Sequence, residues 1–308
     1  MSIADYLQRE IALGSFPGAS WAVGSSRGID QTGAVGHAVA VPLRIPATVD
    51  TIYDCASLTK PLVTTTLALE LFPLDHVIHG YTVFELLTHT TGLRAWLPLY
   101  TFDDPLRAIL EQGPECERGT RVIYSDLNFI LLWMAISNYD DLARSVGARL
   151  KPPPSLKPRI AATEWGQLWE KKMCSHLLRD GLIWGETHDG NSHSLGGGCA
   201  GNAGLFATAT EVFEMTRLVL SRTPPVRNET AALNDARALG WQMGTGSAMT
   251  EMLSPGNFGH TGFTGTSVWI DPKRDKIMVL LTNRVHPIAA ANSMLRIRGE
   301  FHRLALLV

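Results

Sequence analysis

The sequence predicts an α+β fold in which helices flank an antiparallel sheet and a mainly helical domain is inserted into the chain. Strand-like segments fall near both ends of the chain, and the strongest hairpin signal lies close to the C-terminus. Between about residues 75 and 200 the strand signal is lost, and helical patches alternate with loops rich in Gly, Pro and Thr. We therefore predict an α/β domain from residues 1–75 and 205–308, with a mainly helical insertion at 76–204.

The N-terminal part is predicted to hold one helix, two strands and a second, longer helix. Residues 4–14 place apolar side chains on one helical face. The strands are expected at 19–25 and 32–41, because a turn-forming Ser-Arg-Gly sequence separates two apolar segments. A long apolar helix is expected from about 58 to 72, where Pro73 ends it.

The remaining elements follow from the same signals. The hairpin comprises strands 266–270 and 276–282, joined by Asp271-Pro272-Lys273. The other predicted elements are helices at 83–87, 105–112, 127–138 and 210–220, an extended polyproline-like loop at 151–158, a turn at 196–201 and a terminal helix from about 287.

Composition and charge exclude several classes of protein. The chain has 308 residues, 45% of them apolar, which is ample for a folded core and excludes a disordered chain. Its 27 Lys+Arg against 29 Asp+Glu leave a net charge of −2, so we expect no nucleic-acid or membrane partner. The longest apolar run, Phe129 to Ile136, is far shorter than the roughly 20 residues that cross a bilayer.

The N-terminus and the cysteines bear on the compartment and on metal binding. The first residues are polar and acidic, without the basic and apolar segments of a signal peptide, so we expect a cytoplasmic protein. The four cysteines form no C-x-x-C pair, which is typical of reduced, buried thiols. His76/His79 and His188/His193 approach metal-ligand spacing but lack companion ligands, so we expect no metal and no cofactor.

The first candidate for chemistry is Ser57-Leu-Thr-Lys60. On a helix, a Ser and a Lys three residues apart share one face. A desolvated Lys can lose its proton and act as a base toward the hydroxyl. Pro61 restricts this arrangement to the first turns of the helix. The pattern alone is weak, because many surface helices contain it by chance.

Two further segments could complete such a site. Tyr124-Ser-Asp126-Leu-Asn128 directly precedes an apolar helix, where a tyrosine could be held over a cavity. The segment from His260 to Gly265 precedes a strand, and its small residues would let a substrate lie along the sheet edge. Taken singly, the tyrosine could equally be a core aromatic and the glycines an ordinary tight turn.

Together and in this order, the three segments resemble the superfamily of serine β-lactamases, penicillin-binding proteins and family VIII carboxylesterases, in particular its class C type. Ala56-Ser-Leu-Thr-Lys60 resembles the nucleophile motif, and Leu86-Leu-Thr-His-Thr-Thr-Gly-Leu93 resembles the family's "LLTHTSGL" signature. Gly259-His-Thr-Gly262, followed by Trp269-Ile-Asp-Pro272, resembles the third motif and its strand. The similarity extends from about residue 15 to 285, and it implies the β-lactamase/DD-peptidase fold.

The resemblance implies an acyl transfer in two displacements. Ser57 would be the nucleophile, and Lys60 would act as its base or would hold the tyrosinate of Tyr124. Tyr124 would carry the proton to the leaving group and then help to activate water. The backbone N–H groups of Ser57 and Phe263 would form the oxyanion hole. A serine hydroxyl is inert until a base accepts its proton, and the oxyanion needs fixed donors in a dry site.

Two departures from the family pattern bear on the substrate. Asp126 stands where the family often has Asn, and an ionised Asp cannot donate a hydrogen bond to a substrate amide, although it could pair with Lys60. His260, beside Thr261 and Gly262 in the substrate-binding third motif, replaces a Lys and is expected to be largely neutral at pH 7. Both changes favour neutral esters over anionic penicillins.

Three other segments could contribute to the active site or could have a purely structural role. His188-Asp189 resembles the "HDENA" segment of shorter family members and could border the active site, or it could simply stabilise a turn. His89 is expected to be a structural hydrogen-bonding group of its loop. Trp241 could line the acyl pocket or lie in the core.

These observations favour a serine hydrolase that cleaves short-chain carboxylic esters through an acyl-enzyme. Its expected partner is a small-molecule ester, and the oligomeric state is not predicted. The alternative is a β-lactamase or a D-Ala-D-Ala carboxypeptidase or amidase of the same fold. A binding protein that kept the fold is disfavoured, because Ser57, Lys60 and Tyr124 are all present.

Overall fold

The N- and C-terminal parts of the chain together build one large sheet. A computed structural model describes residues 1–137, 146, 148–174, 179–195, 197–223, 226–289 and 294–308. The strands are β1 (Gly18–Ser25), β2 (Gly28–Val39), β3 (Ile45–Pro46), β4 (Tyr53–Asp54), β5 (Val77–Ile78), β6 (Tyr81–Thr82), β7 (Phe206–Ala207), β8 (Gln242–Met243), β9 (Phe258–Thr261), β10 (Ser267–Asp271) and β11 (Lys276–Thr282).

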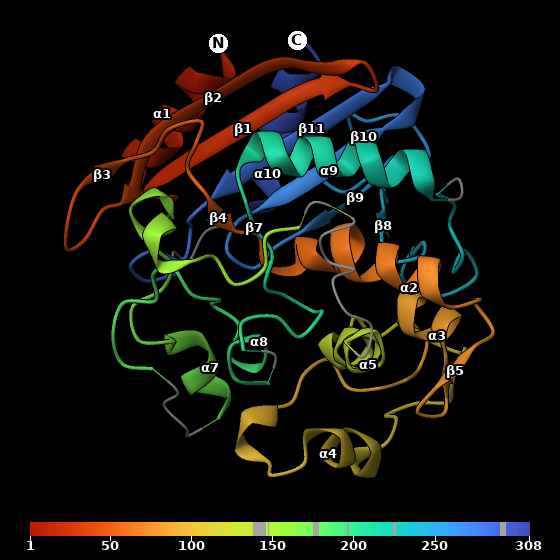
Figure 1. Ribbon diagram of the computed structural model, residues 1–308. Helices are drawn as coiled ribbons and strands as arrows, with labels where there is room; N and C mark the ends of the chain where they lie inside the picture. Colours follow the sequence, from red (N-terminus) through yellow and green to blue (C-terminus); the bar gives the residue numbers. More distant parts are fainter. Residues whose placement is uncertain (138–145, 147, 175–178, 196, 224–225, 290–293) are drawn as a thin grey trace.

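Within the described residues, seven strands form an antiparallel sheet in the order β3-β2-β1-β11-β10-β9-β8. The two ends of the chain meet where β1 pairs with β11, in a register that places Ala19 opposite Thr282 and Gly24 opposite Ile277. Figure 1 shows the N-terminal strands in red beside the C-terminal strands in blue. The predicted antiparallel sheet built from both termini is therefore confirmed.

Helices cover both faces of the sheet and fill the region below it (Figure 1). The α-helices are α1 (Ile3–Ala12), α2 (Thr65–Leu71), α3 (Val83–Thr88), α4 (Pro105–Gln112), α5 (Asp126–Ile136), α7 (Leu168–Met173), α8 (Gly190–Leu195), α9 (Ala209–Arg222) and α10 (Met294–Ala305). The tighter or wider helical turns are η1 (Ala56–Leu58), η2 (Lys60–Thr64), η3 (Leu99–Thr101), η4 (Pro154–Arg159) and η5 (Pro272–Arg274).

Local sequence explains where several of these helices begin. Capping boxes start α1, α3 and α9: the pairs are Ser2 with Asp5, Thr82 with Glu85, and Thr208 with Glu211. In each pair the hydroxyl accepts a backbone N–H of the first turn and the carboxylate accepts the N–H of the capping residue. These reciprocal bonds satisfy donors that the helix itself leaves free.

The central strands are buried on both faces. In β11, Ile277, Val279 and Leu281 belong to the apolar cluster beneath α9, whereas Met278 and Leu280 belong to the cluster under α1 and α10. This alternation follows from the two-residue period of a strand. Figure 1 shows α9 lying across one face of the sheet, with α1 and α10 on the other.

Two predicted segments differ in detail from the structure here, and one small hairpin was not predicted. The Pro-rich segment 151–158, expected to be extended, contains the 3-10 turn η4, because the fixed φ of proline also suits that turn. Residues 77–82 form the small β5–β6 hairpin, whose two-residue strands carry no periodic signal. The C-terminal helix α10 is described from Met294 onward, later than predicted, and residues 290–293 lie outside the described part.

The predicted division at residues 76–204 coincides with the region that contains α3 to α8. Its apolar core is continuous with that of the sheet, since Leu86 and Leu127 share one cluster with Val279. Whether the region is a separate domain stays a prediction. In the described residues we find no helix with the length and apolar character needed to span a membrane.

Candidate active site

Ser57 lies in a tight turn and Lys60 begins a wide one. The predicted helix at 58–72 is divided into η1, the π-helical turn η2 and α2, so that Ser57 falls within η1. Pro61 has no N–H to donate, and the N–H of Thr65 reaches five residues back to the carbonyl of Lys60. In this geometry Lys60 Nζ lies 3.0 Å from Ser57 Oγ.

Lys60 is fully buried and surrounded by oxygens. Besides Ser57 Oγ, its Nζ lies 2.9 Å from the carbonyl of Asn202 and 2.7 Å from Asp126 Oδ1, which matches the three donors of an ammonium group. Burial alone would lower the pKa of Lys60, but the Asp126 carboxylate and the Tyr124 oxygen outweigh burial and raise it. The predicted pairing of Asp126 with Lys60 is confirmed.

Tyr124 is held above Lys60 just before α5. The Lys60 Nζ lies 5.0 Å from the centre of the Tyr124 ring. The ring also packs on His89, with centroids 4.8 Å apart. His89 Nδ1 accepts the backbone N–H of Ser125 at 3.0 Å, so His89 fixes the segment that carries Tyr124. This supports the structural role predicted for His89.

The third motif forms β9 and the turn after it. His260 lies in β9 and is buried, and its Nδ1 lies 2.9 Å from the carbonyl of Thr261. Burial, reinforced by the nearby cations Lys60 and Arg237, holds the pKa of His260 well below its usual range, so the ring is neutral at pH 7. Gly262 abuts the carbonyl of Cys55, where a Cβ would not fit.

A cavity of about 470 Å³ connects these segments. Its lining includes six of the predicted site residues, namely Ser57, Tyr124, His260, Thr261, Gly262 and Phe263. Lys60 lies behind Ser57 rather than in the lining. A larger cavity of about 720 Å³ lies beside α9 and the β10–β11 turn, but its lining includes none of these residues. We therefore take the smaller cavity, called the Ser57 cavity below, as the candidate active site.

Besides Lys60, four predicted residues lie outside the lining of the Ser57 cavity. Trp241 is buried in the core against Phe258, and its neighbour Gln242 lines the cavity instead. Asp126 points to Lys60. His188 pairs with Glu164 and stacks on Phe263, whereas Asp189 accepts the N–H of Ser192 in the first turn of α8.

Three arginines that line the cavity were not among the predicted site residues. Arg237 is neutralised by Asp235. Arg284 follows β11 and donates through Nε to the carbonyl of Phe263 at 2.8 Å. Arg298, in α10 and 6% exposed, donates to the carbonyls of Gly262 and Thr266. No local pattern marks these residues, because they reach the cavity from three separate segments.

The described residues offer no metal centre: they contain no group of three or more His, Cys, Asp and Glu side chains placed to hold an ion.

Known proteins resemble this chain across its length. A family model described as Beta-lactamase matches residues 3–302. The "Putative D-alanyl-D-alanine carboxypeptidase" of Salmonella typhi is 30% identical over 217 residues, which cover 60% of this chain and 50% of that protein. A second relative of the same description, from Salmonella agona, is 29% identical with the same coverage. The chain thus spans about half the length of the curated relatives it matches.

Solved structures show the same fold. A beta-lactamase/D-alanine carboxypeptidase from Yersinia pestis aligns with a TM-score of 0.70 at 15% identity, covering 99% of both chains. EstCE1, described as a hydrolase with promiscuous acyltransferase activity, aligns with a TM-score of 0.69 at 16% identity, covering 96% of this chain and 97% of its own. The family model spans nearly the whole chain, and the fold agrees with it. The chain therefore belongs to the beta-lactamase family, a family of serine hydrolases.

Proposed function

We propose that the chain hydrolyses short-chain carboxylic esters through an acyl-enzyme formed on Ser57. The observation that carries this proposal is the 3.0 Å approach of Lys60 Nζ to Ser57 Oγ, beside a cavity that Tyr124 also lines. A serine hydroxyl beside a buried ammonium and a tyrosine has what nucleophilic catalysis requires: a tyrosine oxygen that can take up the serine proton and pass it to the leaving group, and a cation that stabilises the phenolate.

In the first step Ser57 Oγ attacks the ester carbonyl, and the negative charge on the carbonyl oxygen is met by the N–H groups of Ser57 and Phe263. The Ser57 proton passes to Tyr124, which reacts as its phenolate and becomes a phenol. Tyr124 then gives this proton to the alcohol oxygen as the carbon–oxygen bond of the ester breaks, which restores the phenolate. Water then attacks the acyl group by the reverse proton path, which releases the carboxylic acid and restores Ser57.

The surroundings of Lys60 favour one of the two roles considered for it. Because Asp126 keeps the pKa of Lys60 raised, the amine is charged in the resting site. A charged Lys60 cannot accept the Ser57 proton, but it stabilises the phenolate form of Tyr124, and that form can accept the proton. We therefore assign the base role to Tyr124 and the stabilising charge to Lys60.

A second candidate substrate is an acyl compound with a carboxylate, such as a β-lactam or a peptide ending in D-Ala-D-Ala. Arg284 and Arg298 line the Ser57 cavity, and in the described part of the chain neither forms an ion pair with a carboxylate. Uncompensated guanidinium groups at a cavity wall attract a carboxylate. The Salmonella relatives, described as D-Ala-D-Ala carboxypeptidases, point in the same direction. His260, which is neutral, supports the ester instead.

One assay tests both candidates. The purified chain is given p-nitrophenyl acetate and butyrate, a chromogenic cephalosporin, and an acylated D-Ala-D-Ala peptide. The ester proposal expects the highest kcat/KM on an ester, and a higher value on the cephalosporin or the peptide would overturn it. A fluorophosphonate should label Ser57, as read by peptide mass spectrometry.

Two serine variants make the assignment specific. Ser57→Ala should abolish hydrolysis and labelling with the fold intact. Ser221→Ala is the matched control, because Ser221 lines the larger cavity beside α9, and it should leave both unchanged. Hydrolysis that survives in Ser57→Ala would refute the mechanism. A cytoplasmic location and the absence of nucleic-acid and membrane partners stay predictions.

A further inference from the structure

Asp54, at the end of β4, is a buried carboxylate that the mechanism above does not use. Its side chain is almost fully buried, at 2% exposure, and both of its oxygens accept backbone N–H groups. Oδ1 accepts from Ala56 at 2.8 Å and Oδ2 accepts from His188 at 2.7 Å. Within the described residues Asp54 forms no ion pair with Lys or Arg, so these N–H groups are its partners, and burial outweighs them and raises the pKa of Asp54. Asp54 therefore holds the backbone at Ala56 and His188 in place.

The first bond controls the residue before the nucleophile. Ala56 has a φ of +47°, in the left-handed region that a residue with a Cβ rarely adopts. Such strain persists only where the surroundings hold it. Asp54 Oδ1 holds the N–H of Ala56 directly. Because the backbone torsions of Ala56 set the direction of the next peptide, holding Ala56 also constrains the N–H of Ser57. The Asp54 carboxylate therefore fixes one of the two proposed oxyanion donors.

The second donor is tied to Asp54 from two sides. The carbonyl of Asp54 accepts the hydroxyl of Thr264 at 2.7 Å, and Thr264 follows Phe263 in the chain. His188, whose N–H is held by Asp54 Oδ2, stacks its ring on Phe263, with centroids 5.5 Å apart and planes 23° from parallel. Asp54 thus restricts the movement of Phe263 in two ways: its carbonyl holds the backbone through Thr264, and His188 holds the ring.

We propose that Asp54 is a positioning residue that sets the separation of the Ser57 and Phe263 N–H groups in the oxyanion hole. This inference rests on the proposed function, since it presupposes that an oxyanion forms there. Asp54 does not touch the substrate. Its loss should weaken interactions made in the transition state while leaving ground-state binding in the cavity nearly unchanged, so kcat should fall and KM should not.

The experiment compares Asp54→Ala and Asp54→Asn with a control carboxylate, on the best ester substrate. Losing one oxyanion donor costs about 10²- to 10³-fold in kcat. We expect Asp54→Ala, which misplaces donors without removing them, to lose about 10- to 100-fold, with KM changed less than about threefold. Asp54→Asn should lose less, because its amide oxygen can still accept the Ala56 N–H although its NH₂ cannot accept that of His188.

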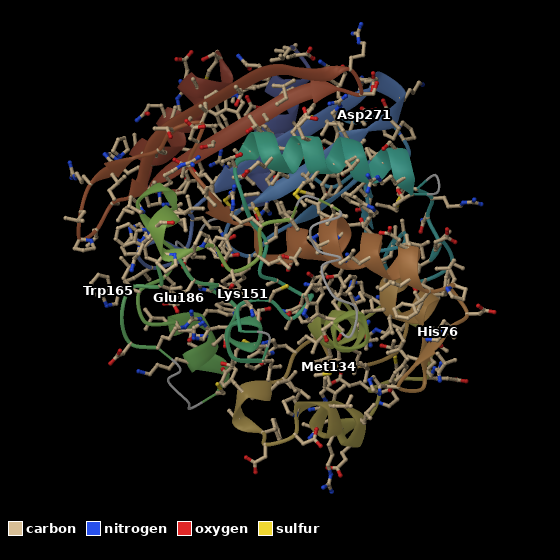
Figure 2. The ribbon with its side chains drawn as sticks, in the orientation of Figure 1. His76, Met134, Lys151, Trp165, Glu186 and Asp271 are labelled. Carbon is tan, nitrogen blue, oxygen red and sulfur yellow. The ribbon has the colours of Figure 1, made fainter. Side chains whose placement is uncertain are left out.

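Asp271 provides the matched control. It is also fully buried and accepts two backbone N–H groups, from Ser254 at 2.9 Å and Arg274 at 3.2 Å. It lies at the end of β10 in the sheet, far from α7 and α8 (Figure 2). Asp271→Ala should lower the melting temperature without lowering kcat. Thr264→Val, which removes only the bond to the Asp54 carbonyl, gives a milder variant that is expected to fold and to lose kcat in the same direction.

A boronic acid supplies a readout that a purely structural role would not move. Boronates add to a catalytic serine and place an anionic oxygen in the oxyanion hole, so their Ki should rise by the same factor as kcat falls across the Asp54 and Thr264 variants. A folded Asp54→Ala with kcat and boronate Ki unchanged would overturn the role of Asp54. So would an equal loss of kcat in Asp271→Ala.

The failure of the proposed function is distinguishable from the failure of this inference. If the wild type hydrolyses no ester, or if Ser57→Ala remains active, the hydrolase mechanism fails and the role of Asp54 fails with it. If hydrolysis depends on Ser57 while Asp54→Ala behaves as the wild type, only the role of Asp54 is lost.

Discussion

Two buried regions of this molecule are built in opposite ways. The first, called here the terminal layer, comprises α1, α10 and the sheet face that they cover. Its core is apolar, with Leu7, Trp269 and Phe301 fully buried. The second comprises the Ser57 cavity and the groups directly behind it, where Lys60 is just as fully buried but is a charged residue.

The terminal layer stabilises the fold, whereas the groups around the Ser57 cavity are arranged for chemistry. Apolar burial in the terminal layer stabilises the fold by roughly 25 cal/mol for each Å² removed from water, without the need for directional partners. Around the Ser57 cavity each buried polar group needs its own partner, and the backbone adopts unusual conformations at Ala56, at His89 and in η2. Such features lower stability and persist where function requires them. Substitutions in the terminal layer should therefore affect stability, whereas those at the cavity should affect activity.

The largest expected effect comes from Lys60 and Tyr124. Because the two act as one unit in proton transfer, Lys60→Ala and Tyr124→Phe should each lower kcat by about 10⁴-fold or more, and the double variant should lose little beyond the singles. Steady-state kinetics of the three variants measure the coupling. Tyr6→Phe, a buried tyrosine of the terminal layer, is the control and should keep full activity. A double-variant loss equal to the product of the two single losses would show that Lys60 and Tyr124 act independently.

A core substitution in the terminal layer should lower the stability of the protein and leave its activity unchanged. Phe301 is fully buried in α10, so Phe301→Ala removes a large side chain and leaves a cavity. We expect the free energy of unfolding to fall by about 3–5 kcal/mol, with kcat of the folded protein unchanged. Denaturant titration and an ester assay below the unfolding transition check the two parts. Leu307→Ala, at a residue that is 75% exposed near the same end of the chain, should change neither. A fall in kcat for folded Phe301→Ala would break the division between the two regions.

The third prediction concerns the absence of a positive charge at position 260 in the Ser57 cavity. His260 is neutral, so His260→Lys introduces a cation where a substrate carboxylate would lie. A charge-assisted hydrogen bond is worth about 1.5–3 kcal/mol, so hydrolysis of a cephalosporin should rise about 10- to 100-fold relative to that of an ester. The ratio of kcat/KM for the cephalosporin to kcat/KM for the ester, in the wild type and in His260→Lys, measures this change. An unmoved ratio would indicate that Arg284 and Arg298 already hold the carboxylate, which would favour the second candidate function.

The two regions also differ in how far the sequence predicts them. The predicted helix at 4–14 and strand at 19–25 agree with α1 and β1 within about two residues, since apolar periodicity encodes a face that packs on apolar neighbours. Near the Ser57 cavity the motifs identified Ser57, Lys60 and Tyr124, which the structure brings together. Periodicity alone would not have found them.

The remaining features of the site depend on tertiary contacts. The left-handed Ala56 is held by a hydrogen bond to Asp54, which local propensity does not encode. Trp241 was a candidate for the acyl pocket, but consecutive residues of extended backbone point to opposite sides, so that Gln242 faces the cavity and Trp241 the core. The position of Arg298 depends on how α10 packs on the sheet.

The smallest effect concerns Glu10, a carboxylate that the terminal layer places against its apolar core. Glu10 is 2% exposed and binds both terminal nitrogens of Arg296, at 2.8 and 2.7 Å, while Ser15 donates to the same carboxylate. Burial alone would raise the pKa of Glu10, but Arg296 and Ser15 outweigh burial and lower it. Since Arg296 is 59% exposed and screened by solvent, we expect Glu10→Gln to cost only about 1 kcal/mol at pH 7.

The sign of its pH dependence follows from the direction of that shift. A carboxyl with a lowered folded pKa stabilises the native state fully above its unfolded pKa, near 4.5, and loses that contribution as the pH falls through the folded value. The stability gap between wild type and Glu10→Gln should thus be constant from pH 7 to about 5.5 and close at lower pH. Urea titrations across this range measure it, with the exposed Glu300–Arg303 pair of α10 as control through Glu300→Gln. A gap that widened toward acid would mean that burial, and not Arg296, dominates the pKa of Glu10, so that the terminal layer would contain an uncompensated carboxylate.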